Sequence, residues 1–307
     1  LSKVFTVTVP PVSGEQADAI RARLTEKLDA GFARAGLTDA VTGEPLACDA
    51  ESGVYTAVND IQLPTTRDFG VDGKVQPVVL ASDDEEVLVV PGVNNAARIA
   101  VYRPAVGEPA ADASFTVTLF DRQTSVSVSK TFSVRVPALT QEEIDSELQL
   151  MAEVKAHYFD GLRGRNTAEN GITQDLTPFQ EVYAQDGQLV WAYKNRELTG
   201  RGIVPTALEG WQELERWRLF RSDNPGVIAD ETLQVTRAKN PKAVTIDSAL
   251  SSQTLGRYGE RYQSDPVKYA AYAGCSGLWY QPVSVRLIVR GTADPQSTDA
   301  VREQITA

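Results

Sequence analysis

The sequence has few of the residues from which metal sites and nucleophilic sites are built. Its 307 residues include one histidine, one methionine and two cysteines. It contains no phosphate loop, dinucleotide-binding fingerprint or zinc-ligand spacing. A catalytic triad would have to use His157, which we place on the surface of a helix. The sequence therefore predicts no catalytic residues, no cofactor and no metal site, and we expect a protein that is not an enzyme.

Long apolar runs and clustered basic residues are also absent. No stretch approaches the roughly 18 apolar residues that a membrane-spanning helix needs. Thirty basic residues face 41 acidic ones, so the formal net charge is −11 and the pI is about 4.8. Nucleic-acid binding needs clustered lysine and arginine, so we expect no nucleic-acid partner and no insertion into a membrane. A hydrolase that uses two carboxylates remains open, although no pair of acids is marked by a motif.

What the sequence does contain is an internal repeat. Residues 2–10 (SKVFTVTVP) recur as residues 129–137 (SKTFSVRVP). Each copy alternates apolar and polar residues, ends in proline and precedes a segment with helical periodicity. We expect the two helices at 14–35 and 141–162, the second with a capping box formed by Thr140 and Glu143.

Further short matches follow in the same order along the chain. They pair Leu63-Pro64-Thr65 with Val204-Pro205-Thr206, Ser82-Asp83 with Ser222-Asp223, Val87-Leu88 with Val227-Ile228, Ile99 to Arg103 with Leu233 to Arg237, and Val117-Thr118-Leu119 with Val244-Thr245-Ile246. Residues 298–306 also resemble residues 17–25. We therefore expect four parts: the last strand of a preceding repeat (1–11), a first repeat (12–137), a second repeat (138–291) and the start of another repeat's helix (292–307).

Each repeat contains a helix and then about seven short strands separated by turn signals. In the first repeat we expect strands near 53–63, 75–81, 86–90, 98–103, 114–120 and 131–136, and hairpin turns at 93–95 and 121–124. This pattern predicts a mainly β fold, with two tandem immunoglobulin-like β-sandwich repeats that are each preceded by an α-helix. Proline stands where each closing strand meets the next helix, which favours a semi-rigid rod.

These residues resemble a known family, the atrophied bacterial immunoglobulin-like domains of large surface proteins in Gram-positive bacteria, especially actinobacteria. The resemblance covers both repeats. It rests on the leading helix, the Leu-Pro-Thr or Val-Pro-Thr strand, the Ser-Asp turn, the strand that ends in Arg103 or Arg237, and the closing strand with Phe132. The family's tryptophan is replaced by Leu80 and Phe220, and the second closing strand has Val285 in place of phenylalanine. The resemblance implies an extracellular surface protein, attached to the cell or its wall, with no catalytic residues to carry over.

The second repeat is longer because of an aromatic-rich insert at 248–282. Its aromatic residues are Tyr258, Tyr262, Tyr269, Tyr272, Trp279 and Tyr280. All four tryptophans, including Trp191, Trp211 and Trp217, also belong to this repeat. One interpretation is a ligand-binding face, because aromatic rings stack on sugars and anchor protein partners. The interpretation that we favour is a secondary core under the insertion, with short helices such as one at 265–273.

Two further features have simple structural interpretations. Cys48 and Cys275 fall in different repeats, and a disulfide needs Cα atoms within about 7 Å, so we expect two free thiols. The acidic run Asp83 to Glu86 offers carboxylates to calcium, as some acidic turns in surface repeats do, but its counterpart in the second repeat has lost most of the charge. We therefore interpret the run as a solvated turn.

Tandem repetition and the lack of marked chemistry favour a structural function. We expect spacer repeats that project a distal functional domain from a bacterial cell surface, with neighbouring repeats of the same chain as partners. The alternative is an adhesive module that binds a host glycan or protein through the aromatic-rich second repeat. We also expect the strand at 2–9 to pair with a neighbouring molecule or with the first repeat.

Overall fold

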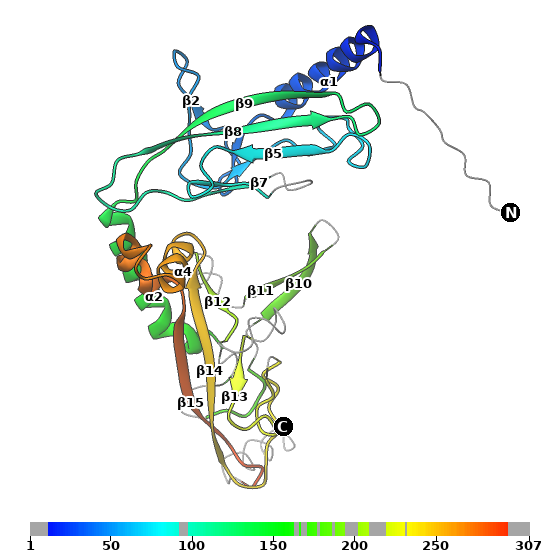
Figure 1. The fold of residues 1–307 in the computed structure, drawn as a ribbon. Helices are drawn as coiled ribbons and strands as arrows, with labels where there is room; N and C mark the ends of the chain where they lie inside the picture. Colours follow the sequence, from blue (N-terminus) through cyan, green and yellow to red (C-terminus); the bar gives the residue numbers. More distant parts are fainter. Residues whose placement is uncertain are drawn as a thin grey trace, which may run out of the picture. The chain divides into compact units, whose positions relative to one another are not determined.

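The computed structural model describes residues 12–91, 98–162, 166, 171–176, 179–185, 188–193, 202–208, 219–230 and 232–293 (Figure 1). It divides into two compact units, Leu1–Thr140 (unit 1) and Gln141–Ala307 (unit 2). Both units combine helices with antiparallel sheets, so the β-rich class predicted from the sequence is confirmed at this level. The predicted strand at 2–9, the turn at 93–95 and the helix beyond residue 293 lie outside the described residues.

Unit 1 begins with helix α1 (Gly14–Ala35), which has the predicted bounds. Ser13 caps it: the Ser13 side chain accepts a hydrogen bond from the Gln16 amide, and the Gln16 side chain accepts one from the Ser13 amide. Such a capping box satisfies backbone donors that have no partner within the helix. Leu24 and Leu28 are buried one turn apart, as the 3.6-residue period requires.

The strands of unit 1 form two sheets. The smaller has the order β1 (Thr38–Asp39), β4 (Ile61–Gln62), β7 (Arg98–Val101), β6 (Leu88–Val89), and the larger has the order β2 (Ala47–Cys48), β3 (Tyr55–Thr56), β9 (Ser127–Val136), β8 (Ala111–Phe120), β5 (Val78–Ser82). All neighbours are antiparallel except β3 and β9, which are parallel. Buried and half-buried residues alternate along β8, so one face of the larger sheet points to the core.

Residues from both sheets and α1 share one core in unit 1. Its aromatic part joins Phe32 of α1 to Phe132 of β9, with ring centroids 4.6 Å apart, and Phe132 to Phe115 of β8, at 5.2 Å. Phe69 lies 5.4 Å from Phe32 on the other side. The helix is therefore fixed to the sheets by aromatic contacts as well as by its leucines.

Unit 2 begins with helix α2 (Gln141–Leu162), which also has the predicted bounds. Its buried side chains are Ile144, Met151, Val154 and Tyr158. In its other described residues, β10 (Phe179–Gln185) and β11 (Gln188–Tyr193) form a hairpin. A second sheet has β14 (Lys242–Ser252) paired with β12 (Ile203–Thr206), β13 (Arg221–Ser222) and β15 (Gln281–Val289). The described helices after α2 are α4 (Gly256–Ser264) and η1 (Ala270–Leu278). The Tyr158 ring is parallel to that of Phe220, at 6.3 Å.

The same set of polar contacts occurs separately within each unit, and we call it the polar framework. In unit 1 the Asp83 carboxylate accepts a hydrogen bond from the Ser114 amide, and the Asp83 amide donates to the Ser114 carbonyl. In unit 2 the Asp223 carboxylate and amide make the same two bonds to Thr245. The Ser-Asp motif found in the sequence therefore has one structural role in both units, which is to join its turn to the long central strand.

A second shared contact uses an acid that the sequence comparison missed. The buried carboxylate of Asp60 accepts a hydrogen bond from the Val101 amide at 3.0 Å. The Asp175 carboxylate accepts one from the Val235 amide at 2.7 Å. Val101 and Val235 each lie two residues before the arginine that ends the strand, so the two acids are structural equivalents.

The third shared contact holds the chain just after the last described strand of each unit, β9 in unit 1 and β15 in unit 2. Arg103 donates from Nε to the carbonyl of Pro137 at 3.0 Å and from Nη2 to that of Ala138 at 2.7 Å. Arg237 makes the same pair of bonds, at 2.9 Å and 2.7 Å, to the two residues that follow β15. We call these contacts the exit clamps. The arginine that ends a strand in both repeats is therefore a bidentate donor to the exit segment.

Two of the sequence matches need correction. Ser114 and Thr245 make the same hydrogen bonds to the Ser-Asp turn, so they are counterparts in the two units. The counterpart of Val117 therefore lies four residues after Val244, and the sequence match at this strand is wrong. Central strands of alternating threonine and apolar residues look alike in several registers, so the sequence did not determine the register.

The match of Leu63-Pro64-Thr65 with Val204-Pro205-Thr206 is also wrong. Leu63 follows β4 in the smaller sheet of unit 1, whereas Pro205 belongs to β12 and pairs with Leu250 of β14. β12 and β13 pair with β14 in the register in which β5 pairs with β8, so the two strands together are the counterpart of β5. Residues 207–220 lie between them in the sequence. A three-residue match was too short to distinguish these two strands.

Candidate functional site

The aromatic insertion of unit 2 replaces a tight turn of unit 1. In unit 1, β8 and β9 are joined by the turn that starts at Asp121, close to the predicted hairpin. In unit 2 the equivalent strands β14 and β15 are joined by residues 253–280, which hold α4 and η1 (Figure 1). The insertion packs against its own unit, since η1 contacts α2.

The insertion holds short helices, as expected, but the bounds 265–273 are wrong: α4 ends at Ser264 and η1 begins at Ala270. The chain between α4 and η1 turns instead, because the Asp265 carboxylate accepts hydrogen bonds from the amides of Val267 and Lys268. A side chain that bonds its own backbone in this way competes with helix formation. Proline at position 266 is consistent with a break at this point.

The two helices of the insertion are closely packed. A Cβ atom at Gly259 would lie 2.5 Å from the Cys275 carbonyl oxygen and 2.9 Å from the Cβ of Trp279. A Cβ atom at Gly256 would lie 3.1 Å from the Leu278 carbonyl oxygen. Cys275 and Leu278 are fully buried. The insertion is therefore a folded element whose close backbone contact depends on glycine.

The structure divides the six aromatic residues predicted as a ligand-binding face. Tyr258 is 3% exposed and belongs to the core of the insertion. The other five, Tyr262, Tyr269, Tyr272, Trp279 and Tyr280, are partly exposed. Tyr272 stands between two other rings, with its centroid 5.3 Å from that of Tyr258 and 6.4 Å from that of Tyr269. A row of three tyrosines thus runs from the buried core to the surface.

Basic side chains lie over the outer end of this row. The Lys268 ammonium is 4.8 Å from the centroid of Tyr269, and the Arg261 guanidinium is 5.4 Å from it. Both distances fall within the cation–π range of about 6 Å. Neighbouring Val267 is 89% exposed. We call Arg261, Lys268, Tyr269 and Tyr272 the basic-aromatic patch.

The basic-aromatic patch contains no tryptophan among the residues that the structure describes. Trp211 and Trp217 lie outside the described residues, and the side chain of Trp191 on β11 does as well. Trp279 is partly buried against Gly259.

The two cysteines are free thiols in separate units. Cys48 is exposed in unit 1, whereas Cys275 is fully buried in unit 2. Burial raises the pKa of the Cys275 thiol to about 11. Since the thiolate is the reactive form, Cys275 is protected from alkylation at neutral pH.

The acidic run in unit 1 is used for local hydrogen bonds. The Asp83 carboxylate bonds the amide and hydroxyl of Ser114, and Asp84 accepts from the amides of Glu86 and Val87. Among the described residues, no group of three or more histidine, cysteine or acidic side chains is placed to hold a metal ion. No helix in the described part of the chain is long and apolar enough to span a membrane.

An open hollow of about 440 Å³ lies on the larger sheet of unit 1. Its polar lining includes Asp83, Asp112, Ser114 and Arg135. Arg135 donates to both oxygens of Asp112, at 2.8 Å and 3.0 Å, and Asp83 is bonded to Ser114. The charged groups of the hollow are thus all engaged in hydrogen bonds within its lining.

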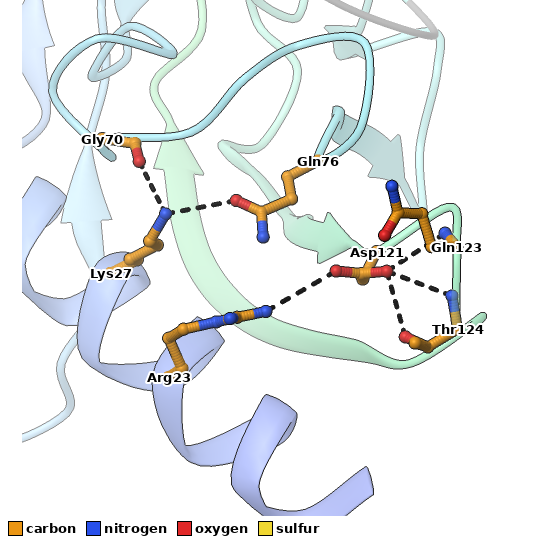
Figure 2. Close-up of polar contacts among 7 residues, drawn as sticks. All are labelled: Arg23, Lys27, Gly70, Gln76, Asp121, Gln123 and Thr124. Carbon is orange, nitrogen blue, oxygen red and sulfur yellow. Dashed lines mark hydrogen bonds and ion pairs between the residues drawn. The ribbon is translucent and has the colours of Figure 1, made fainter. Parts of the chain in front are cut away.

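Polar contacts also hold α1 to the turn after β8 (Figure 2). The nearly buried carboxylate of Asp121 accepts hydrogen bonds from the amides of Gln123 and Thr124 and from the Thr124 hydroxyl, and it faces Arg23 of α1 at 3.7 Å. One turn along the helix, Lys27 donates to the Gly70 carbonyl at 2.7 Å and to the Gln76 side chain at 3.2 Å.

These contacts set the pKa of Asp121. Burial raises the pKa, but the hydrogen bonds from Thr124, Gln76 and Gln123 outweigh burial and hold the pKa below its ordinary value of 3.8. No motif in the sequence marks this contact, because its partners are far apart in the chain.

In unit 2 the acid that anchors the first helix lies on the helix itself, and its partners lie at the end of the central strand. Ser252 stands where unit 1 has Asp121, and its hydroxyl accepts from the amides of Thr254 and Leu255. The acid is now on the helix: Glu147 of α2 accepts from the hydroxyls of Ser252, at 2.6 Å, and Thr254, at 2.8 Å.

No protein-family model matches the chain, and no curated protein matches it.

Proposed function

We propose that the chain consists of non-catalytic spacer repeats of a bacterial cell-surface protein, which project a distal functional domain away from the cell. The observation that carries this proposal is the repeated exit clamp. A spacer must fix the direction in which the chain leaves each repeat, and both units place a bidentate arginine at that point.

Further contacts at the exits support a stiff junction. In unit 1 the Leu139 amide donates to the Pro104 carbonyl, and Leu139 is buried two residues before α2 begins. In unit 2 the Thr292 amide donates to the Ala238 carbonyl in the equivalent place. Little free chain therefore remains between the end of unit 1 and α2, and short restrained linkers behave as stiff spacers.

We also propose that both units are immunoglobulin-like β-sandwich repeats. In support, the core of unit 1 takes residues from two separate sheets, and the two long strands β8 and β9 form an antiparallel hairpin. Unit 2 repeats the central hairpin as β14 and β15. The resemblance to surface-protein domains adds the extracellular location and the neighbouring repeats as partners.

Distances between spin labels test the spacer proposal. In a Cys48→Ser background, one label is placed at Ser129→Cys on β9 and one at Gln263→Cys on α4. Both positions are exposed, whereas Cys275 is buried and stays unlabelled. A stiff spacer gives one narrow distribution of distances. A broad or multiple distribution would contradict it.

The exposed part of the insertion favours a second function. An adhesive module would present aromatic side chains at its surface, and five of the six predicted aromatics are partly exposed. A screen of host glycans and matrix proteins with the wild type and Trp279→Ala tests this alternative. Saturable binding that the variant loses would support adhesion, and no binding to any member of the screen would count against it.

A further inference from the structure

We propose that the basic-aromatic patch of unit 2 binds an acidic polysaccharide whose sugars carry carboxylates. The proposal deepens the adhesive alternative by naming a ligand class, and it rests on that alternative. Its basis is the combination of partly exposed tyrosines and basic side chains on one closely packed element.

The charge of the insertion differs from that of the chain. The whole sequence has 41 acids against 30 basic residues, but residues 253–280 hold three basic residues, Arg257, Arg261 and Lys268, against two acids. One of these acids, Asp265, is engaged with the amides of Val267 and Lys268. An acidic polymer is repelled by most of the protein surface, so a local basic site would direct where it binds.

The positions of the basic groups suit a carboxylated sugar. Arg257 and Arg261 stand one turn apart on α4, so they point to the same side of the helix. Arg261 and Lys268 approach Tyr269 from α4 and from the following turn. Arginine binds carboxylates through two parallel hydrogen bonds, and tyrosine offers an apolar ring to the C–H face of a sugar.

The patch is also preorganised. Tyr272 links Tyr269 to the buried Tyr258, and the glycine contacts between α4 and η1 leave little space for movement. When side chains are already held in place, binding costs less conformational entropy. A small surface can then bind its ligand more tightly. Unit 1 has only a short turn at the equivalent position, so we expect this site in unit 2 alone.

Titration calorimetry with three polymers tests the proposal: hyaluronan as the carboxylated polysaccharide, dextran as a neutral one and dextran sulfate as a sulfated one. Lys268→Glu and Tyr269→Leu alter the patch. Lys242→Glu, at an exposed position of β14, makes the same charge change elsewhere in unit 2. Circular dichroism and melting temperature verify that each variant is folded.

We expect saturable binding of hyaluronan, weakened about tenfold or more by Lys268→Glu and by Tyr269→Leu and less than about twofold by Lys242→Glu. No binding of hyaluronan, equal losses in both lysine variants, or equal affinity for dextran would overturn the proposal. Binding of dextran sulfate without hyaluronan would overturn the carboxylate class. The spin-label distances judge the spacer proposal separately, so the two can fail independently.

Discussion

Unit 1 and unit 2 use the same polar framework but connect their central strands in different ways. In both, an aspartate joins the Ser-Asp turn to the central strand and an arginine clamps the exit. Unit 1 then closes its hairpin with a short turn, whereas unit 2 inserts α4 and η1. The comparison separates the contacts that every repeat needs from those added to one repeat, and we look for special function among the latter.

The largest effect is expected at the exit clamps. Arg103→Ala and Arg237→Ala should each lower the free energy of unfolding by about 3 kcal/mol, because two charge-assisted hydrogen bonds are lost and Arg103 is buried. Denaturant titration measures the change. Arg122→Ala, at an exposed position of the hairpin turn, is the control and should change little. Similar losses in all three variants would mean that the clamps have no special role.

The next effect concerns the element that only unit 2 has. Gly259→Ala should cost about 2 kcal/mol, since its Cβ would overlap the Cys275 carbonyl and backbone must shift. Gly274→Ala on η1 is the matched control, because nothing lies within 4 Å of its Cβ position. Thermal unfolding of both variants distinguishes them. Equal stability would show that the insertion is not closely packed.

The helix anchors should differ between the units. Glu147→Ala should cost about 1.5 kcal/mol, because the hydroxyls of Ser252 and Thr254 lose a charged acceptor. Arg23→Ala should cost less than about 1 kcal/mol, since its ion pair with Asp121 is long and the arginine is 55% exposed. Denaturant titration ranks them, and the reverse order would contradict this account of the anchors.

The smallest effect is the dependence on pH. The pKa of Asp121 is lower in the folded protein than its ordinary value, so its ionised form stabilises unit 1 above about pH 4. This contribution is lost as the pH falls below 3.8 and through the lower folded pKa. Asp121→Ser copies Ser252 of unit 2 and should make the acid limb of the stability curve less steep, at a cost below about 1 kcal/mol near neutral pH. An unchanged acid limb would exclude Asp121 as its source.

The two long helices, α1 and α2, and the central strands could be predicted from the sequence because their signals are local. The bounds of α1 and α2 followed from apolar periodicity, and the Ser-Asp turn followed from a repeated dipeptide. The register of β14 and the place of β12 could not, because the sequence match there was short and the strands resemble one another.

The candidate site was predicted only in part. Composition marked the tyrosines of the insertion, but it could not distinguish buried Tyr258 from its partly exposed neighbours, because exposure depends on how α4 packs on η1. The contribution of Arg261 and Lys268 was missed for the same reason. The equivalence of Asp60 and Asp175 was missed because a single acid carries no motif.

The central claim is that the exit clamp makes the junction between the units stiff. The most direct measurement is the spin-label distance between Ser129→Cys and Gln263→Cys in three backgrounds that all carry Cys48→Ser: one otherwise wild type, one with Arg103→Ala and one with Arg122→Ala. Our account predicts one narrow distribution in the wild type, a broad one in Arg103→Ala and a narrow one in Arg122→Ala. A broad distribution in the wild type, or one in Arg103→Ala that is as narrow as in the wild type, would contradict it.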